Sequence, residues 1–184
     1  MRYPKECVLK DCQEAVIRPL VSGDEDQLAK FYEELPEADR WFIRHDTTQP
    51  DVLRRWFKGS GSDDVASVIA ICKERIVGHG SLRRRGFGIT RHVGRIQIVV
   101  LPDFRRQRLG TWLMLDLIQL AMDKGLEEIR IDLVTGIEDA AIEAATGLDF
   151  FKAAVLRDYV KDSQGQRHDL AIMVKRLHKT WSDF

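Results

Sequence analysis

The stretch Val99-Val100-Leu101-Pro102-Asp103-Phe104-Arg105-Arg106-Gln107-Arg108-Leu109-Gly110-Thr111 decides the fold, together with the residues on either side of it. A strand is predicted from Arg95 to Val100, because apolar and polar residues alternate there. Pro102 ends the strand, since proline cannot donate to a sheet ladder. The stretch therefore predicts a strand, a short basic loop and the beginning of a helix.

The helix that follows is predicted from about Gly110 to Lys124 and is expected to be packed on nearly every side. Gly125 is placed to end it, because glycine readily adopts the left-handed conformation that follows a helix. Only three polar residues interrupt the apolar surface: Asp116, Gln119 and Asp123.

The basic loop predicts a site for a polyphosphate anion. The first backbone N–H groups of a helix have no internal partner and lie at the positive end of the helix dipole. Arg105, Arg106 and Arg108 add full charges around those groups. The ligand is therefore expected to be held largely by the backbone.

The same residues carry a family pattern, V-x-P-x-x-R-x-x-G-x-G/A followed by an amphipathic helix. The chain matches it at Val100, Pro102, Arg105 and Gly110, and has Arg108 at the first glycine of the pair. This stretch resembles the cofactor signature of the GNAT superfamily of acyl-CoA-dependent N-acyltransferases. The alternative is a basic loop that merely connects a strand to a helix.

The order of the predicted elements is similar to that of the same family. It implies an α/β fold, a single domain over residues 14–184 with a mixed, mostly antiparallel sheet of about seven strands flanked by helices. Residues 1–13 are then an N-terminal extension. Before the central strand we expect a strand at 15–20, a helix after a capping box at Ser22–Glu25, short helices near 40–44 and from Pro50, and a hairpin of 65–72 with 76–82. After the long helix we expect a strand at 128–133, a helix at 137–146, and a hairpin of 150–160 with 167–175.

The resemblance implies acetyl-CoA as the acyl donor and assigns cofactor binding to the end of the strand and to the loop. In the family a backbone amide of the central strand holds the thioester oxygen. The residues expected to bind the cofactor are Ile98, Val99, Val100, Arg105, Arg106, Gln107, Arg108, Leu109, Gly110 and Thr111.

The general base and acid of the reaction are not evident from the pattern. Arg95 stands where many relatives carry a carboxylate base, and Ala145 stands where many carry a tyrosine acid. The substitutes are His168, Asp169, His79 and Tyr159. The competing interpretation is that these side chains satisfy hydrogen bonds in the sheet or pack there, and that a chain of water molecules is the base.

The acceptor site is expected near the short helices and the central strand. Arg95 and Gln97 share a face of that strand, and a cation there favours an acceptor with an anionic group beside its amine, although a buried pair between Arg95 and a nearby carboxylate explains the residue equally well. Asp46 beside His45 resembles an acid–base pair, although capping a loop explains it equally well. The residues expected to contact the acceptor are Arg40, Arg44, Asp46, Arg95 and Gln97. Arg83, Arg84 and Arg85 would contact the 3′-phosphate of the cofactor or an acidic acceptor, or form a solvated loop.

Composition limits the partners. Lysine plus arginine equals aspartate plus glutamate at 29 each, so the net charge is zero. This argues against a general nucleic-acid or membrane-surface binder, since both need a basic excess. The three cysteines have no metal-site spacing, so no metal is expected, and an odd thiol favours a reducing, cytoplasmic setting. The N-terminus carries no apolar signal core.

Two functions remain open from the sequence. The first is an N-acyltransferase that moves an acetyl group to a primary amine of a small molecule or a protein lysine, by direct attack in a ternary complex. The second is a non-catalytic acyl-CoA sensor, because the two familiar catalytic side chains are missing. A homodimer is compatible with either function.

Overall fold

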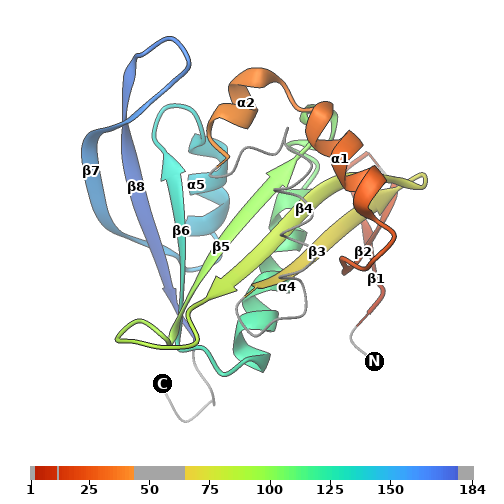
Figure 1. The fold of residues 1–184 in the computed structure, drawn as a ribbon, viewed down its shortest axis with the longest axis horizontal. Coiled ribbons are helices and arrows are strands. Elements are labelled where there is room, and N and C mark those ends of the chain that lie inside the picture. The colour runs from red at the N-terminus through yellow and green to blue at the C-terminus, as the bar shows by residue number, and fades with distance from the viewer. Residues whose placement is uncertain (1–2, 12, 44–64, 178–184) are drawn as a thin grey trace. The chain divides into compact units, whose positions relative to one another are not determined.

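The computed structural model describes residues 3–11, 13–43 and 65–177. The predicted substrate residues Arg44 and Asp46 and the predicted helix from Pro50 lie outside the described residues. The predicted α/β fold with a mixed sheet flanked by helices is confirmed (Figure 1). The helices are α1 (Glu25–Glu33), α2 (Glu37–Trp41), the 3-10 helix η1 (Pro102–Phe104), α4 (Leu109–Asp123) and α5 (Asp139–Thr146).

The sheet has eight described strands, against about seven predicted, in the order β1-β2-β3-β4-β5-β6-β8-β7. The additional strand is β1, which lies in the stretch expected to be an N-terminal extension. The strands are β1 (Lys5–Val8), β2 (Glu14–Pro19), β3 (Val65–Cys72), β4 (Arg75–Arg84), β5 (Val93–Val100), β6 (Glu128–Val134), β7 (Phe151–Lys161) and β8 (Arg167–Arg176).

The chain forms two compact units, whose boundaries fall inside β4, β5 and α4. One contains residues Met1–Ser81 and Gln97–Leu115. In it β1, β2 and β3 pair antiparallel, with Cys7 opposite Ala15 and Val16 opposite Ile71. Its core contains the large buried side chains of Leu28, Phe31 and Tyr32 from α1, which recur at helical spacing as the sequence predicts.

The other unit contains residues Leu82–Ile96 and Asp116–Phe184. Here β5 runs parallel to β6, with Val93–Arg95 beside Glu128–Arg130, and β8 is antiparallel to both β6 and β7. Gly94 is required by close packing, because a Cβ atom there would lie 2.7 Å from Leu82 Cδ1. Helix α5 lies beside β6 (Figure 1).

The prediction that α4 is packed on nearly every side is wrong. Trp112, Leu115 and Met122 are each about two fifths exposed, at 41%, 41% and 39%, whereas Asp116 is buried at 2%. An apolar residue can remain on a solvated face, so composition alone does not define the buried face of a helix. The end of α4 is as predicted: Gly125 has φ +71°, and Leu126 N donates to Ala121 O.

The predicted capping box at Ser22–Glu25 is also wrong. Helix α1 begins at Glu25 with Asp24 as its N-cap, and no side chain caps it. Asp24 instead accepts two bonds of 2.7 Å from Arg18, and this hydrogen-bonded guanidinium lowers the pKa of the carboxyl. Glu25 Oε2 accepts from Gly23 N rather than reaching Ser22. The Asp24 carboxyl thus pairs with Arg18 and makes no side-chain cap to α1.

Among the described residues, no helix is both long and apolar enough to cross a bilayer.

Candidate active site

The loop between β5 and α4 adopts a backbone that usually requires glycine. Arg106 has φ +58° and Arg108 has φ +68°, and both side chains are exposed. The left-handed region is disfavoured for residues with a Cβ atom, so these two positions are strained. Arg108 occupies the position where the family pattern has its first glycine. The chain therefore keeps the glycine-type turn while placing a cation there.

The turn leads into the N-terminus of α4, where the first backbone N–H groups have no acceptor within the helix. The first intrahelical bond at this end runs from Trp112 N to Arg108 O, at 3.0 Å. The N–H groups of Leu109, Gly110 and Thr111 precede it and therefore have no acceptor within the helix. Successive N–H groups in a turn of this kind form a concave anion site.

Gly110 leaves open space at this head. A Cβ atom built on it would have Val100 Cγ2 as its nearest neighbour, at 4.0 Å. The protein itself therefore does not require glycine here, which distinguishes Gly110 from the tightly packed Gly94. A phosphate group brought against these amides would occupy that space. The residues present thus fit the diphosphate part of acetyl-CoA.

Two of the predicted cofactor residues are engaged by the protein. Arg105 Nε donates to Val100 O at 3.1 Å, and its Nη2 donates to Asp39 Oδ2 at 2.7 Å. Gln107 accepts from Lys10 N with its carbonyl and from Asp11 N with its side chain, at 3.4 and 3.1 Å. These contacts fix the loop to α2 and to the turn after β1.

The end of β5 offers backbone donors at its free edge. Leu101 N donates to Val77 O, so the odd-numbered residues at this end direct their N–H groups toward β4. Because successive residues of a strand point to opposite edges, Ile98 and Val100 direct theirs away from β4. Of the three residues expected to hold the thioester oxygen, Val99 is therefore the least suitable.

The structure places Arg95 in a cluster with a buried carboxylate. Arg130 binds Asp132 with Nε at 2.5 Å and Nη2 at 3.2 Å, and Arg95 Nη2 lies 3.5 Å from the same carboxyl. The Asp132 side chain is only 4% exposed, whereas that of Arg95 is 42% exposed. Gln97 on β5 and Arg40 on α2 are half-buried.

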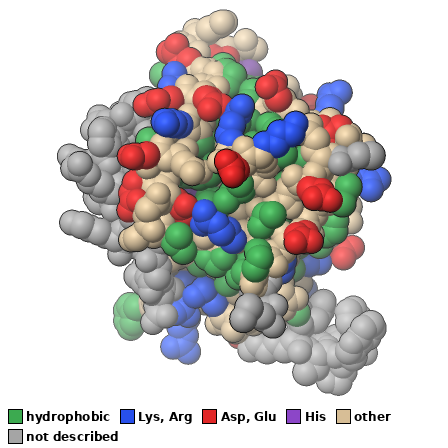
Figure 2. All heavy atoms as spheres, turned by 90° about the vertical axis from the view of Figure 1, so that its right-hand side faces the viewer, with side chains coloured by type: hydrophobic (Ala, Val, Ile, Leu, Met, Phe, Trp, Pro, Cys, Tyr) green, Lys and Arg blue, Asp and Glu red, His purple; other side chains and the backbone are tan. Residues whose placement is uncertain are grey.

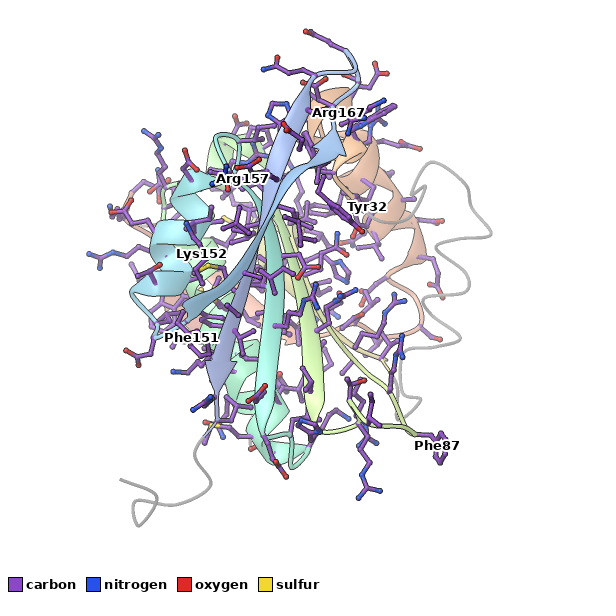
Figure 3. All side chains as sticks on the ribbon, turned by 90° about the vertical axis from the view of Figure 1, so that its left-hand side faces the viewer. Tyr32, Phe87, Phe151, Lys152, Arg157 and Arg167 are labelled. Carbon is purple, nitrogen blue, oxygen red and sulfur yellow. The ribbon has the colours of Figure 1, made fainter. Side chains whose placement is uncertain are left out.

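His79 is buried in a pair with Tyr32. Tyr32 Oη lies 2.8 Å from His79 Nδ1, and the two side chains are 2% and 3% exposed. Figure 3 shows Tyr32 on α1. Burial lowers the pKa of His79 from 6.5 to about 4 and raises that of Tyr32 well above its usual 10. The neutral imidazole is therefore the stable form at neutral pH.

The other three predicted catalytic residues lie on the β7–β8 hairpin. His168 Nε2 is 2.9 Å from Asp162 Oδ2, and this hydrogen bond is the largest cause of a lowered Asp162 pKa. Asp169 Oδ1 accepts from Asp158 N at 2.9 Å, which closes a bulge where Asp158 has φ +51°. Tyr159 follows in that bulge and is 66% exposed.

Sequence reasoning missed Asp39, Arg130 and Asp132. Asp132 carried a usable signal, since a charged residue alternates there with the apolar residues of a predicted strand. Asp39 carried none, because its partner Arg105 is 66 residues away in the chain.

Comparisons with known proteins agree with this geometry. The model of the acetyltransferase (GNAT) family matches residues 27–150. A GNAT-family acetyltransferase from Streptococcus pneumoniae has the same fold, with a TM-score of 0.77 and 20% identity, covering 88% of this chain and 99% of that one. The structure of yncA, a putative acetyltransferase from Salmonella typhimurium with its cofactor acetyl-CoA, matches with a TM-score of 0.77 and 21% identity, covering 91% of this chain and 96% of that one. The GNAT domain of S. lividans PAT matches with a TM-score of 0.76 and 15% identity, covering 95% of this chain and 97% of that one.

A search among proteins of curated function found no significant match. The family model nevertheless covers more than half of the chain, and the matched range includes the loop described above. The protein therefore belongs to the GNAT family of acetyltransferases.

Proposed function

We propose that this protein transfers the acetyl group of acetyl-CoA to a primary amine, on a small molecule or a protein lysine, by direct attack within a ternary complex. The observation that carries the proposal is the head of α4, where the Leu109, Gly110 and Thr111 donors lie beside the open space at Gly110. Three neighbouring amides at a helix N-terminus suit a diphosphate better than a neutral ligand.

The chemistry requires a donor for the oxygen on which negative charge develops. The N–H groups of Ile98 and Val100 supply it from the free edge of β5. Preorganised backbone donors are effective because they need no rearrangement during the reaction. No side chain is involved, so this contribution is independent of the missing carboxylate and tyrosine.

The chemistry also requires a neutral amine, although a lysine-type amine has a pKa near 10.4. We propose that water removes its proton. His79 is buried against Tyr32, and His168 and Asp169 are bonded to Asp162 and Asp158, so each has a structural partner. Because each candidate side chain already has a hydrogen-bond partner in the protein, a water molecule is the better candidate for the base.

For the acceptor we propose a molecule with an anionic group beside its amine. Support comes from Arg95, whose side chain is 42% exposed although it also lies 3.5 Å from Asp132, which Arg130 binds on both oxygens. An amino acid should therefore react faster than its amide. Arg95→Gln should abolish this preference with little effect on the rate for the amide.

The decisive experiment measures acetyl transfer from acetyl-CoA across a panel of amino acids, amino-acid amides, diamines and lysine peptides. Thiol release gives the rate, and mass spectrometry identifies the product. The proposal requires an amine-dependent rate and an acetylated amine. Tight binding of acetyl-CoA without product over the whole panel would contradict it and would favour the sensor instead.

We further propose a cytoplasmic homodimer. The free, buried thiols of Cys7 and Cys72 support a reducing compartment. Strand β7 is last in the sheet order and exposed along most of its length, with Phe151 and Val155 46% and 42% exposed. A second copy covering β7 would bury this apolar edge. Light scattering of the parent should give twice the mass of one chain. The Val155→Lys variant should give the mass of a single chain.

A further inference from the structure

The loop that joins β4 to β5, Arg85–His92, carries the two most exposed large apolar side chains among the described residues. Phe87 is 91% exposed and Ile89 is 95% exposed. Figure 3 shows Phe87 projecting outward from this loop. We call this segment the Phe87 loop.

The fold does not need apolar residues at these positions. The loop is shaped by its backbone: Gly88 has φ +100°, Arg91 N donates to Gly88 O at 3.2 Å, and Val93 N donates to Thr90 O at 3.0 Å. At their exposures, Phe87 and Ile89 contribute almost nothing to a core. A polar residue would serve the turn as well, so their apolar character points to a partner.

The charge around the loop has one sign. Arg85 and Arg91 flank the apolar pair and are exposed, and the sequence has no acidic residue between Glu74 and Asp103. Arg83 and Arg84 have contacts of their own, whereas Arg85 and Arg91 are the exposed arginines beside the apolar pair.

Among the described residues, two glutamates lie on the segment whose backbone bonds to His92. Glu127 N and Glu128 N donate to His92 O at 2.9 and 3.3 Å, which places both residues at the base of the loop. Glu128 lies 3.7 Å from Arg176, which offsets its charge. The tip beyond this base is therefore basic.

The form of the tip favours one class of partner. A single-stranded nucleic acid would stack its bases on aromatic rings, and Ile89 cannot provide such a platform. A protein partner would need a pocket shaped for two side chains on a convex turn. A fluid bilayer conforms to such a tip: apolar side chains enter the interface, and arginines pair with lipid phosphates.

We propose that the Phe87 loop docks the protein onto membranes that contain anionic phospholipid. Phe87 and Ile89 enter the interfacial region, and Arg85 and Arg91 bind the lipid phosphates. This departs from the expectation drawn from the zero net charge. The zero net charge is a sum over the whole sequence, and the sequence around the loop carries arginines without acidic residues, so the overall balance conceals a local excess there. On the face shown in Figure 2, by contrast, acidic and basic side chains lie close together.

Co-sedimentation with vesicles tests the proposal. The full chain should bind vesicles of phosphatidylcholine mixed with phosphatidylglycerol, and bind vesicles of phosphatidylcholine alone at least tenfold more weakly. Raising the salt to about 0.5 M should release most of the protein, because the Debye length shortens. Inorganic phosphate at the same phosphate concentration should compete only weakly, since it lacks the apolar contact.

Two pairs of variants separate the contributions. Phe87→Ser with Ile89→Ser, and Arg85→Glu with Arg91→Glu, should each weaken vesicle binding at least tenfold. The apolar pair, which has no part in the cofactor site, should leave acetyl-CoA binding unchanged. Val8→Ser with Val21→Ser removes two other exposed apolar side chains, and Lys30→Glu with Lys152→Glu changes the net charge equally. Both control pairs should bind like the parent.

Three results would overturn the proposal: no binding of the parent to anionic vesicles, equal binding to neutral vesicles, or binding that survives the loss of Phe87 and Ile89. Binding to an RNA oligomer that depends on the arginines but not on the apolar pair, without vesicle binding, would assign the loop to nucleic acid instead.

Discussion

The loop from Pro102 to Thr111 and the β7–β8 hairpin both look functional in sequence, but the structure uses their polar groups differently. In the loop, side chains such as Arg105 and Gln107 fix the backbone, and the backbone N–H groups remain for a ligand. In the hairpin, His168 and Asp169 bind Asp162 and Asp158, within the hairpin itself. The chemical type of a residue is therefore a weaker guide to function than the groups that its contacts leave available.

The largest expected effect is on the pH dependence of stability and comes from His79. Like the hairpin residues, this histidine is a titratable side chain that the fold already uses. Its pKa is about 4 in the folded protein and 6.5 ordinarily. Between pH 6.5 and about 4, His79 binds a proton in the unfolded chain but stays neutral in the folded protein. Stability should therefore fall as the pH drops from about 6.5 to 4, by up to about 3 kcal/mol, and then level off.

Urea unfolding at several pH values measures this change. His79→Asn keeps a partner for Tyr32 Oη but does not titrate, so its unfolding free energy should depend less on pH across the same window. If parent and variant showed the same slope, His79 would be ionised or accessible, and a catalytic role would regain support.

Gly110→Val should show the next largest effect, on the ligand rather than on the fold. Among the described residues, a Cβ at this position meets nothing closer than 4.0 Å, but it occupies the space proposed for a phosphate. Acetyl-CoA affinity should fall by more than tenfold, about 1.4 kcal/mol. Calorimetry measures the affinity, and circular dichroism checks the fold.

Arg108→Gly is the matched change in the same loop. It relieves the positive φ of Arg108, so stability should rise by about 1 kcal/mol. Affinity for acetyl-CoA should fall only mildly, and the difference should shrink as salt is raised. A large, salt-independent loss would mean that the arginine side chain, not the backbone, binds the phosphate.

Asp169 tests the hairpin side of the comparison. Asp169→Ala removes the acceptor of Asp158 N and should cost roughly 1 kcal/mol of stability, with turnover within tenfold of the parent. Asp169→Asn keeps an acceptor oxygen and should restore most of the stability. A catalytic base would instead lose a factor of about 10² to 10⁴ in both variants.

Asp39→Ala should have the smallest effect. It releases Arg105 from α2, and both side chains are partly exposed, at 43% and 31%. An exposed ion pair contributes about 0.2–1 kcal/mol, so acetyl-CoA should bind two- to fivefold more weakly. Calorimetry of Asp39→Ala, Arg105→Ala and the double variant would show whether the two losses are coupled. Additive losses would mean that this contact does not position the loop.

The fold and the position of the loop between β5 and α4 could be predicted because their signals are local. Alternation, Pro102 and the terminal Gly125 define β5 and α4 from neighbouring residues. The predicted capping box is absent because α1 begins two residues later than expected, with Asp24 rather than Ser22 at the N-cap position and with the Asp24 carboxyl bound to Arg18. The strand β1 was missed because its four residues are too short for a clear period.

The candidate catalytic residues could not be ranked from sequence for a different reason. Whether a histidine is available depends on partners brought by the fold, as Tyr32 is brought to His79 from 47 residues away. The strain at Arg106 and Arg108 was likewise hidden, because nothing in an arginine residue indicates positive φ. The family pattern did contain this information, as the glycine that Arg108 replaces.

In the mechanism proposed above, backbone amides at the head of α4 bind the diphosphate of CoA. Amide chemical shifts of the isotopically labelled protein, followed while CoA is added, test it most directly. We expect the largest shifts at Gln107 to Thr111, and much smaller ones there with pantetheine, which lacks the diphosphate and the nucleotide. Shifts concentrated on the β7–β8 hairpin, or the same loop shifts with pantetheine, would contradict the account.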